Sequence, residues 1–274
     1  MLHDNQIKNK LFSVFLFVIL FSVSYTKGQI PKTKDFYAII KKYDVNKLWI
    51  SDSLLVMDHD FDSNGKSISF EPRKIGFPEP FGFIGSNYQR FYIHFLSVSK
   101  SKNDPYKYIV SGKTKVKNNI CSFKGTIAIN KSILYEEQDD KRFIQGSVYG
   151  VYKFYEDSSQ PSSGYITGVL KTDFYLDNKQ QIFYDDLNLI ADDYCNNQFT
   201  GTWKSYKIKS MTKKCHWGDF RIPGCGDLDN GAGDFGVNNK YRNNGWQSYM
   251  QSTGGVDSTT ENKARDAENE KWWK

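Results

Sequence analysis

Histidine and the common catalytic motifs are scarce in this chain. It has 4 histidines in 274 residues, and beyond the N-terminal region only His59, His94 and His216 remain. None of them stands beside a nucleophile in a recognisable motif, and the G-x-S-x-G turn that exposes a nucleophilic serine is absent. The sequence therefore offers no catalytic residue, and an extracytoplasmic hydrolase is the least favoured of the functions considered below.

The chain also lacks a large excess of charge of one sign. The chain has 37 basic and 31 acidic residues, a formal net charge of +6, and its lysines are scattered among acids. A protein that tracks a nucleic-acid backbone concentrates lysine and arginine on one face or along one element. Nucleic acid is therefore not an expected partner.

The longest hydrophobic run is too short to cross a membrane. Lys8 and Lys10 precede an apolar run at 11–24, and Thr26 and Gly28 supply small residues before a cleavage site. A charged start and about 7–15 apolar residues are typical of a secretory signal peptide, whereas a membrane span needs about 20. We expect residues 1–28 to be removed and the remaining chain to be secreted or periplasmic, without a transmembrane segment. An uncleaved anchor is the alternative.

Cysteine is sparse, and no pair has the C-x-x-C spacing of a zinc site. An even number of cysteines in an exported chain favours disulfides, and four cysteines allow three connectivities. The short separation of Cys215 and Cys225 favours a bond between them, which leaves Cys121 with Cys195.

A short strand pattern recurs four times in the middle of the chain. Each copy has an apolar residue, a polar or charged one, glycine, a small or β-branched residue and another apolar one; the copies are 123–127, 144–148, 166–170 and 199–203. Period-two alternation indicates strands with one buried face, and the glycine lies on that face in every copy. Glycine weakens a strand, so its repeated use there indicates a tight bend or room for a large side chain from another strand.

The rest of the chain fits an all-β architecture of 8–10 antiparallel strands, either an up-and-down barrel or a strongly curled sheet. Further strands are expected at 48–57, 90–98, 107–115 and 180–190, with turn residues between them. The pattern predicts an N-terminal helix at 33–44, within a segment 29–47, and a barrel domain at 48–210. A cysteine and acidic loop region, 211–236, then precedes a polar tail, 237–274, in which Ser258 and Glu261 have the spacing of a capping box. A helix is expected at 259–272, and Trp272 and Trp273 are expected to dock on the barrel.

Two of the repeated segments, F-T-G-T-W at 199–203 and F-K-G-T-I at 123–127, are similar to avidin-type strand sequences. Residues 120–206 as a whole resemble the lipocalin and avidin-like (calycin) barrels. Lipocalins carry Gly-x-Trp in their first strand, whereas Gly201-Thr-Trp203 comes near the end of this sheet. The resemblance implies a barrel fold, and it transfers no ligand-binding residue.

Two acidic segments have calcium-loop features. Residues 60–71 match the EF-hand loop pattern in full, but Asn64-Gly65 is also the strongest hairpin signal, and Pro72 disfavours an exit helix. A hairpin that pairs Phe61 with Ile68 is the preferred interpretation. In the second segment, Asp227, Asp229 and Asp234 alternate with glycines and are candidate calcium ligands; a glycine-rich surface loop is the alternative.

Aromatic residues are in excess, at 16% of the chain. Candidate ligand-binding residues are Trp203 and the tyrosines opposite the inward glycines, which are Tyr149, Tyr155, Tyr165 and Tyr175. Exposed tyrosines bind sugars or proteins, and cross-strand tyrosine pairs that stabilise a sheet are the alternative. The sequence thus favours a secreted non-catalytic binding protein, with a small ligand in the barrel or a partner on its aromatic outer face. A secreted inhibitor or immunity-type protein is the second choice.

Overall fold

The computed structural model of this protein describes residues 31–61, 67–138 and 140–274. The expected signal peptide lies outside the described residues, so export and its cleavage site stay predictions. The first half of the described chain contains β1 (Thr33–Asp35), α1 (Tyr37–Ile40), the 3-10 helix η1 (Asn46–Leu48), β2 (Ser53–Phe61), β3 (Ser67–Gly76), β4 (Phe81–Ile84), β5 (Gln89–Arg90), β6 (Tyr92–Lys100), β7 (Lys107–Val116) and β8 (Asn119–Tyr135). The second half contains β9 (Ile144–Glu156), β10 (Gly164–Leu176), β11 (Ile182–Tyr184), β12 (Asn196–Ser205), β13 (Thr212–Asp219), η2 (Gly226–Leu228), η3 (Asn239–Asn244), α2 (Gln247–Ser252) and α3 (Ser258–Glu268).

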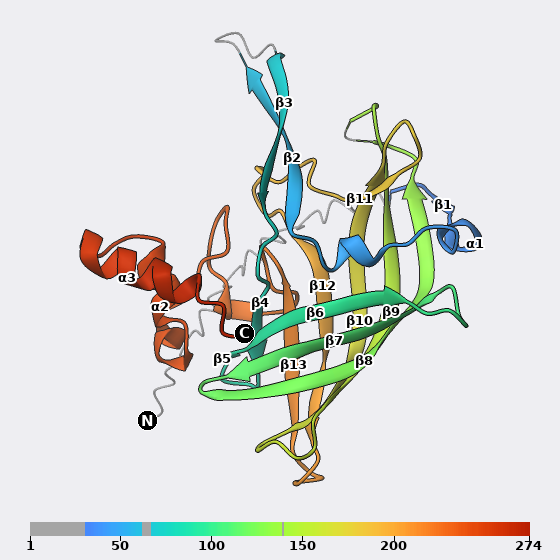
Figure 1. Ribbon diagram of the computed structural model, residues 1–274. Coiled ribbons are helices and arrows are strands. Elements are labelled where there is room, and N and C mark those ends of the chain that lie inside the picture. Colours follow the sequence, from blue (N-terminus) through green and yellow to red (C-terminus); the bar gives the residue numbers. More distant parts are fainter. Residues whose placement is uncertain (1–30, 62–66, 139) are drawn as a thin grey trace, which may run out of the picture. The chain divides into compact units, whose positions relative to one another are not determined.

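Nine antiparallel strands form one sheet that curls into a half-barrel (Figure 1). Their order across the sheet is β5-β4-β13-β12-β10-β9-β8-β7-β6, and β1 and β11 pair with β8 and β10 outside this path. Between β6 and β10 each strand pairs with the next one in the chain, as the short turn segments of the sequence predict. The all-β, strongly curled antiparallel architecture expected from the sequence is therefore confirmed.

The two edges of the curled sheet meet at one end through a single continuous segment. β5 pairs with β4, and after Phe91 the same segment continues as β6, which pairs with β7. The Phe91 amide donates to the Gly82 carbonyl of β4 at 2.9 Å. Beyond this point β6 runs beside β7 alone, so the sheet is closed at the Phe91 end and has a seam between β6 and β13 at the other.

The inward glycines make room for aromatic side chains of neighbouring strands, as the repeated pattern predicted. Gly168 of β10 and Gly201 of β12 are direct partners. A Cβ atom at Gly201 would lie 2.2 Å from the Tyr152 hydroxyl of β9, and one at Gly168 would lie 2.6 Å from it. At Gly146 the close neighbour is the ring of Phe174, at 2.8 Å. These distances are too short for any side chain, so the ring packing requires glycine.

Aromatic rings fill the middle of the half-barrel. Phe199 stacks on Trp217 with ring centroids 4.8 Å apart, and Tyr152 meets both rings edge-on. Phe95 reaches across from β6 to within 5.6 Å of Phe154. Such contacts add to the hydrophobic stabilisation of buried rings. The centre of the half-barrel is therefore packed, and space for a ligand occurs at its margins.

A second hydrophobic cluster covers the outer face of β4 and β13. Ile84 and Cys215 point into the main core, whereas the preceding Phe83 points to the other face of the sheet. There it packs with Cys225, Trp246 and other apolar residues of the C-terminal segment. The extension after β13 is thus anchored on the sheet by its own small core.

The C-terminal helices are also held by a buried ion pair. Arg90 is 5% exposed and donates to both carboxylate oxygens of Glu268 at 2.9 and 2.6 Å. Its guanidinium lies 4.5 Å from the Tyr92 ring centroid. At the end of the chain, Trp273 stacks on His94 with centroids 3.8 Å apart, and Trp272 contacts Tyr92. The expected docking of the terminal tryptophans on the sheet is confirmed.

Several predicted boundaries are wrong. The barrel does not end at 210, because β13 continues the sheet to Asp219. The helix expected at 33–44 is reduced to α1, since residues 33–35 pair with β8 instead. The strand expected at 48–57 begins at Ser53, and that at 180–190 covers only β11. The terminal helix ends at Glu268, and its N-cap is Asp257, whose side chain accepts from the Thr260 amide.

The hairpin expected near residue 64 is confirmed, although its turn, 62–66, lies outside the described residues. β2 and β3 pair as an antiparallel two-stranded sheet. The expected partner of Phe61 is wrong by one residue, because a register shift after Asp60 pairs Phe61 with Ser67 instead of Ile68. β3 also occupies the place where an EF-hand would have its exit helix, which argues against that motif.

The cysteines do not form the expected disulfides. All four are free thiols in this structure. Cys215 faces the main core, whereas Cys225 packs in the second cluster on the other face of the sheet. Cys121 contacts the Pro161 carbonyl near the Phe91 end of the half-barrel, and Cys195 precedes β12 at the opposite end. The sulfur atoms of neither predicted pair therefore lie within disulfide-bonding distance of each other in this structure.

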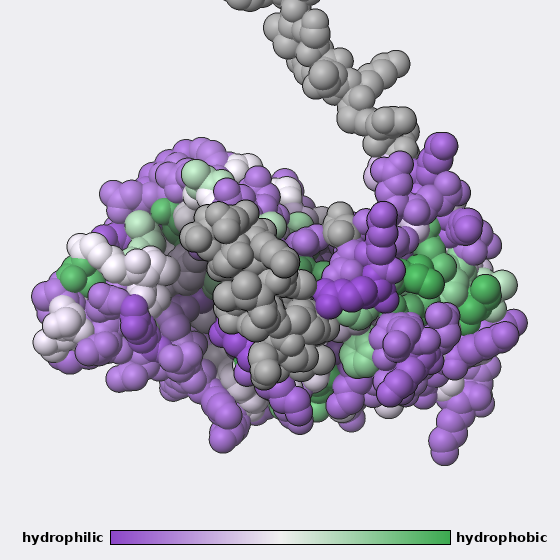
Figure 2. Space-filling model, turned by 90° about the horizontal axis from the view of Figure 1, so that it is seen from above, coloured by the Kyte–Doolittle hydropathy of each residue, from purple (hydrophilic) through white to green (hydrophobic). Residues whose placement is uncertain are grey.

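The surface view from above is mostly hydrophilic, with hydrophobic residues in small groups (Figure 2). None of the helices in the described part of the chain has the length and hydrophobicity that crossing a bilayer requires.

Candidate functional site

A large cleft opens at the Phe91 end of the half-barrel. Its free volume is about 1140 Å³. Three hairpin turns and one irregular segment converge on it: the β7–β8, β9–β10 and β12–β13 turns and the β4–β5 connection. Antiparallel strands joined in sequence bring alternate turns to the same end of a sheet, which is why these distant segments meet. We call this space the end cleft.

Apolar side chains and a buried carboxylate line the inner part of the end cleft. Phe91, Trp203 and Met211 contribute apolar surface. Glu156, 7% exposed, accepts from the Trp203 indole at 2.9 Å, the Thr114 hydroxyl at 2.6 Å and the Gly164 amide at 2.7 Å. These three donors compensate for burying the charge. The carboxylate is therefore fully engaged within the protein and fixes the orientation of the Trp203 ring.

The rim of the end cleft is basic. Lys117, Lys207 and Lys213 line it, together with serine and amide side chains from the three turns. Glu156 is the one acidic side chain in the lining. A cleft lined by one sign of charge concentrates ligands of the opposite sign. The end cleft thus combines a basic, hydrogen-bonding rim with an apolar interior.

Two rim residues have a backbone conformation that usually requires glycine. Lys117 has a φ of 53° in the two-residue β7–β8 turn, and Ser162 has a φ of 54° in the β9–β10 turn. For residues with a side chain this region costs about 1–2 kcal/mol. Residues held in such conformations are frequent at binding sites, where the side chain has a use that offsets the cost. Among the described residues the same conformation also occurs outside the end cleft, at Tyr88, Gln180, Asp193, Asn197 and Phe220, so it does not by itself distinguish this end of the sheet.

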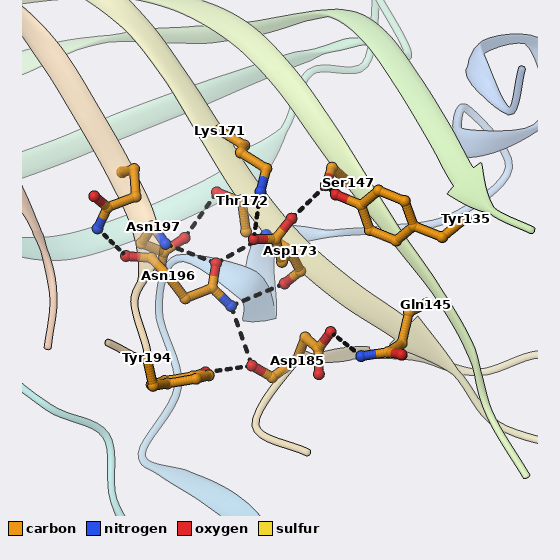
Figure 3. A network of polar contacts seen from close by, with 11 residues as sticks. Tyr135, Gln145, Ser147, Lys171, Thr172, Asp173, Asp185, Tyr194, Asn196 and Asn197 are labelled. Carbon is orange, nitrogen blue, oxygen red and sulfur yellow. Dashed lines mark hydrogen bonds and ion pairs between the residues drawn. The ribbon is translucent and has the colours of Figure 1, made fainter. Parts of the chain in front are cut away.

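A network of buried polar side chains lies at the opposite end of the sheet (Figure 3). Its centre is Asn196, whose amide oxygen accepts from the Asp173 amide at 2.8 Å and whose amide nitrogen donates to the Asp173 and Asp185 carbonyls. Asn197 lies in the same irregular start of β12, and its side-chain oxygen accepts a hydrogen bond from the Thr172 hydroxyl. Because most of these bonds go to the backbone, the network joins β10 to the start of β12, and we assign it a structural role.

The seam between β6 and β13 holds a smaller pocket of about 80 Å³. Asp219 lines this pocket, is 2% exposed and has a pKa far from that of an ordinary aspartate. Burial, together with the Glu79 carboxylate, raises the pKa of Asp219 to about 7, although hydrogen bonds from Asn197 and Tyr184 act in the opposite direction. The end cleft therefore has the volume that a ligand needs, and the seam pocket has the perturbed carboxyl group.

The candidate aromatic residues are not gathered in one site. Trp203 lines the end cleft. Tyr155 and Tyr165 are direct partners across β9 and β10 on the outer face, with ring centroids 6.0 Å apart, so the cross-strand pairing considered from the sequence is present. Tyr149 lies beneath the Lys131 amine, at 5.0 Å. Tyr175 is 2% exposed and stacks on Phe183, which removes it from any surface.

The three candidate calcium ligands do not converge. Asp229 pairs with Arg221 at 2.7 Å and accepts from the Gly231 amide. The Asp227 carboxylate instead forms an ion pair with Lys240 and accepts a hydrogen bond from the Tyr241 hydroxyl. Among the described residues no group of three carboxylate, histidine or cysteine side chains is placed to hold a metal ion. Calcium binding by Asp227, Asp229 and Asp234 stays a prediction, and in this structure Asp227 and Asp229 have protein partners.

The sequence did not identify the lysines of the end cleft, Glu156 or Asp219. Each lies in an ordinary-looking strand end or turn, and only the pairing of distant strands brings it to a cavity. Comparison with known protein families, with characterised proteins and with solved structures found no match. The calycin resemblance therefore stays a prediction.

Proposed function

We propose that this protein is a non-catalytic binding protein that takes a small ligand into the end cleft, and that it works outside the cytoplasm. The observation that carries the proposal is the cleft itself, whose volume of about 1140 Å³ is comparable to that of small-molecule sites. The expected signal peptide supports the location.

The ligand that fits this lining is a small molecule with an apolar part and an acidic group. The apolar part would lie against Trp203, Phe91 and Met211, and the acidic group would meet the lysines of the rim. The lining described for the cleft includes no histidine or cysteine, and its one carboxylate, Glu156, is engaged by three donors. Binding is therefore better supported than acid–base or nucleophilic catalysis.

Native mass spectrometry of the protein purified from its own source tests this proposal. A co-purified small molecule should appear as a mass difference that collisional activation removes. In a variant with Ile208→Trp, where the side chain is 47% exposed and lines the cleft, the added mass should be lost.

A matched control is Ile109→Trp on the outer face of β7, where the isoleucine is 48% exposed. This variant should keep the bound mass, because it adds the same ring far from the cleft. If both variants kept the bound mass equally well, the ligand would lie outside the end cleft. Turnover of a glycan or peptide by the purified protein would replace the binding proposal with an enzymatic one.

A further inference from the structure

The seam pocket is a second cavity, separate from the end cleft. β6 and β13 diverge beyond the Phe91 end, and residues 49–51 and 77–80 lie between them. The pocket shares none of the end cleft's lining residues. The last residues of the chain are close by, because Trp273 stacks on His94 of β6, and the marked C-terminus lies beside this strand in Figure 1.

Aromatic rings make up much of the seam pocket's lining. They come from five separate segments of the chain and are Trp49, Phe77, Phe95, Phe199 and Trp217. The faces of aromatic rings carry partial negative charge and attract cations, tryptophan most strongly. Rings contributed from several directions are the common way in which proteins enclose alkylated ammonium groups.

The charged side chains of the seam pocket are acidic. Glu79 and Asp219 line it, and among the described residues no lysine or arginine does so. His94 is the third titratable group, and its Nδ1 lies 2.9 Å from a Glu79 oxygen. Even with His94 protonated, an ionised Asp219 leaves the pocket with a net negative charge. This is the reverse of the end cleft, whose rim is basic.

Asp219 has an oxygen to offer to a ligand. Its protein hydrogen bonds, from the Tyr184 hydroxyl at 3.0 Å and the Asn197 amide at 2.7 Å, both fall on Oδ2. No hydrogen bond from a described residue reaches Oδ1. The carboxyl group of Asp219 thus lines the cavity with one oxygen that the donors named here do not use.

We propose that the seam pocket binds a small alkylammonium group, with the Asp219 carboxylate as its counter-ion and the surrounding rings as its cage. The volume of about 80 Å³ is well below the ~150 Å³ of a cavity that accepts benzene, so the head group must be smaller than a benzene ring, as methylammonium is. The two acids disfavour an anion. A neutral ligand of the same size would gain the ring contacts and would leave Asp219 without a counter-ion.

Methylammonium is the probe, and methanol, which has a similar size, a hydrogen-bond donor and no charge, is its comparison. Binding is followed by NMR on the indole N–H signals of Trp49 and Trp217 in the full chain. Methylammonium should bind at least about tenfold more tightly than methanol, because only the cation gains the electrostatic attraction to Asp219 and the ring faces.

Two variants test the assignment of the counter-ion. Asp219→Asn should weaken methylammonium binding by at least about tenfold, because it keeps the shape of the side chain and removes its charge. Asp266→Asn, on the exposed face of α3, removes the same charge far from the pocket and should leave the affinity unchanged. Thermal melting of each variant shows whether it is folded.

The proposal is overturned if methanol binds as tightly as methylammonium, or if Asp219→Asn is folded and binds the cation as well as the natural protein does. Absence of any shift of the Trp49 and Trp217 signals in the folded natural protein also overturns it. Because the two cavities share no lining residue, these results are independent of whether the end cleft holds a ligand.

Discussion

Replacement of Asp219 by asparagine should change how stability depends on pH. The pKa of this carboxyl is about 7 in the folded protein, against 3.8 for an ordinary aspartate. Between these values the folded state holds a proton that the unfolded state has released. The contribution of Asp219 to stability is therefore fully present below the unfolded pKa and is lost as the pH rises through the folded pKa.

The size of this effect follows from the two pKa values. Raising the pH from about 5 to about 8 removes about 2.6 kcal/mol of the contribution of Asp219 to the free energy of unfolding. Asparagine does not ionise, and its oxygen still accepts from Tyr184 and Asn197. The free energy of unfolding of the variant should therefore not show this loss. As the pH rises from about 5 to about 8, it should increase by about 2–3 kcal/mol relative to that of the natural protein.

Urea unfolding of the two proteins at about pH 5, 6.5 and 8 measures the difference. The comparison between proteins matters because other groups titrate in this interval. Burial lowers the pKa of His216, so His216 costs stability as the pH falls, which is the opposite trend. Subtracting the two curves removes such shared contributions. Parallel curves for the natural protein and Asp219→Asn would refute the reasoning.

Four further substitutions test other parts of the structure by urea unfolding. Tyr152→Phe should be neutral or stabilising by up to about 1 kcal/mol, because no described residue bonds the buried hydroxyl; a loss above this would reveal a partner. Gly201→Ala should cost at least about 2 kcal/mol, since its Cβ would lie 2.2 Å from that hydroxyl; a neutral result would contradict the packing. Glu268→Ala should cost about 3–5 kcal/mol by leaving Arg90 buried without its carboxylate, and should speed proteolysis of the C-terminal helices; an unchanged rate would refute that anchor. Lys117→Gly should stabilise by about 1–2 kcal/mol and weaken ligand binding in the end cleft, measured by native mass spectrometry; unchanged binding would remove Lys117 from the site.

The strands of the half-barrel could be predicted because their signal is local. Alternation along residues 144–154 and 166–174 places an apolar group or glycine at most second positions. Burial follows this pattern from Val148 onward, whereas at the start of β9 Ile144 is exposed and Gln145 and Ser147 are buried. The inward glycines were informative for the same reason. A glycine on the buried face of a strand implies a large neighbour, and Tyr152 and Phe174 are the neighbours.

The boundaries that failed depend on partners far away in the sequence. Residues 33–35 have helical spacing, but their backbone pairs with residues 133–135 of β8. β4 has only four residues and was not expected as a strand; it is one because β13 supplies its hydrogen bonds. The cysteines were paired by their spacing in the sequence, which does not show that Cys215 and Cys225 lie on opposite faces of the sheet.

The two cavities could not be predicted for a related reason. Lys117 and Lys213 belong to short lysine-containing segments near strand ends that resemble ordinary surface positions, and the end cleft exists only because their strands end on the same side. Asp219 follows Trp217 in what resembles an ordinary amphipathic strand. Burial raises the pKa of this carboxyl group, although Asn197 and Tyr184, which come from other strands, donate hydrogen bonds that lower it. Enclosure of this kind leaves no pattern in the sequence.

The pairing of β4 with β13 also determines when this protein can finish folding. β6 to β10 each pair with a neighbour in the chain, so they can assemble while synthesis is still under way. β4 is made before all of them and pairs locally with β5, yet its other edge, where Ile84 meets Cys215, has no partner until β13 has emerged. Long-range pairing of this kind is slow and exposes an unpaired edge in the meantime. A chain stopped before β13 would therefore be an aggregation hazard, and the pairing of β13 with β4 is the step that ends this exposure.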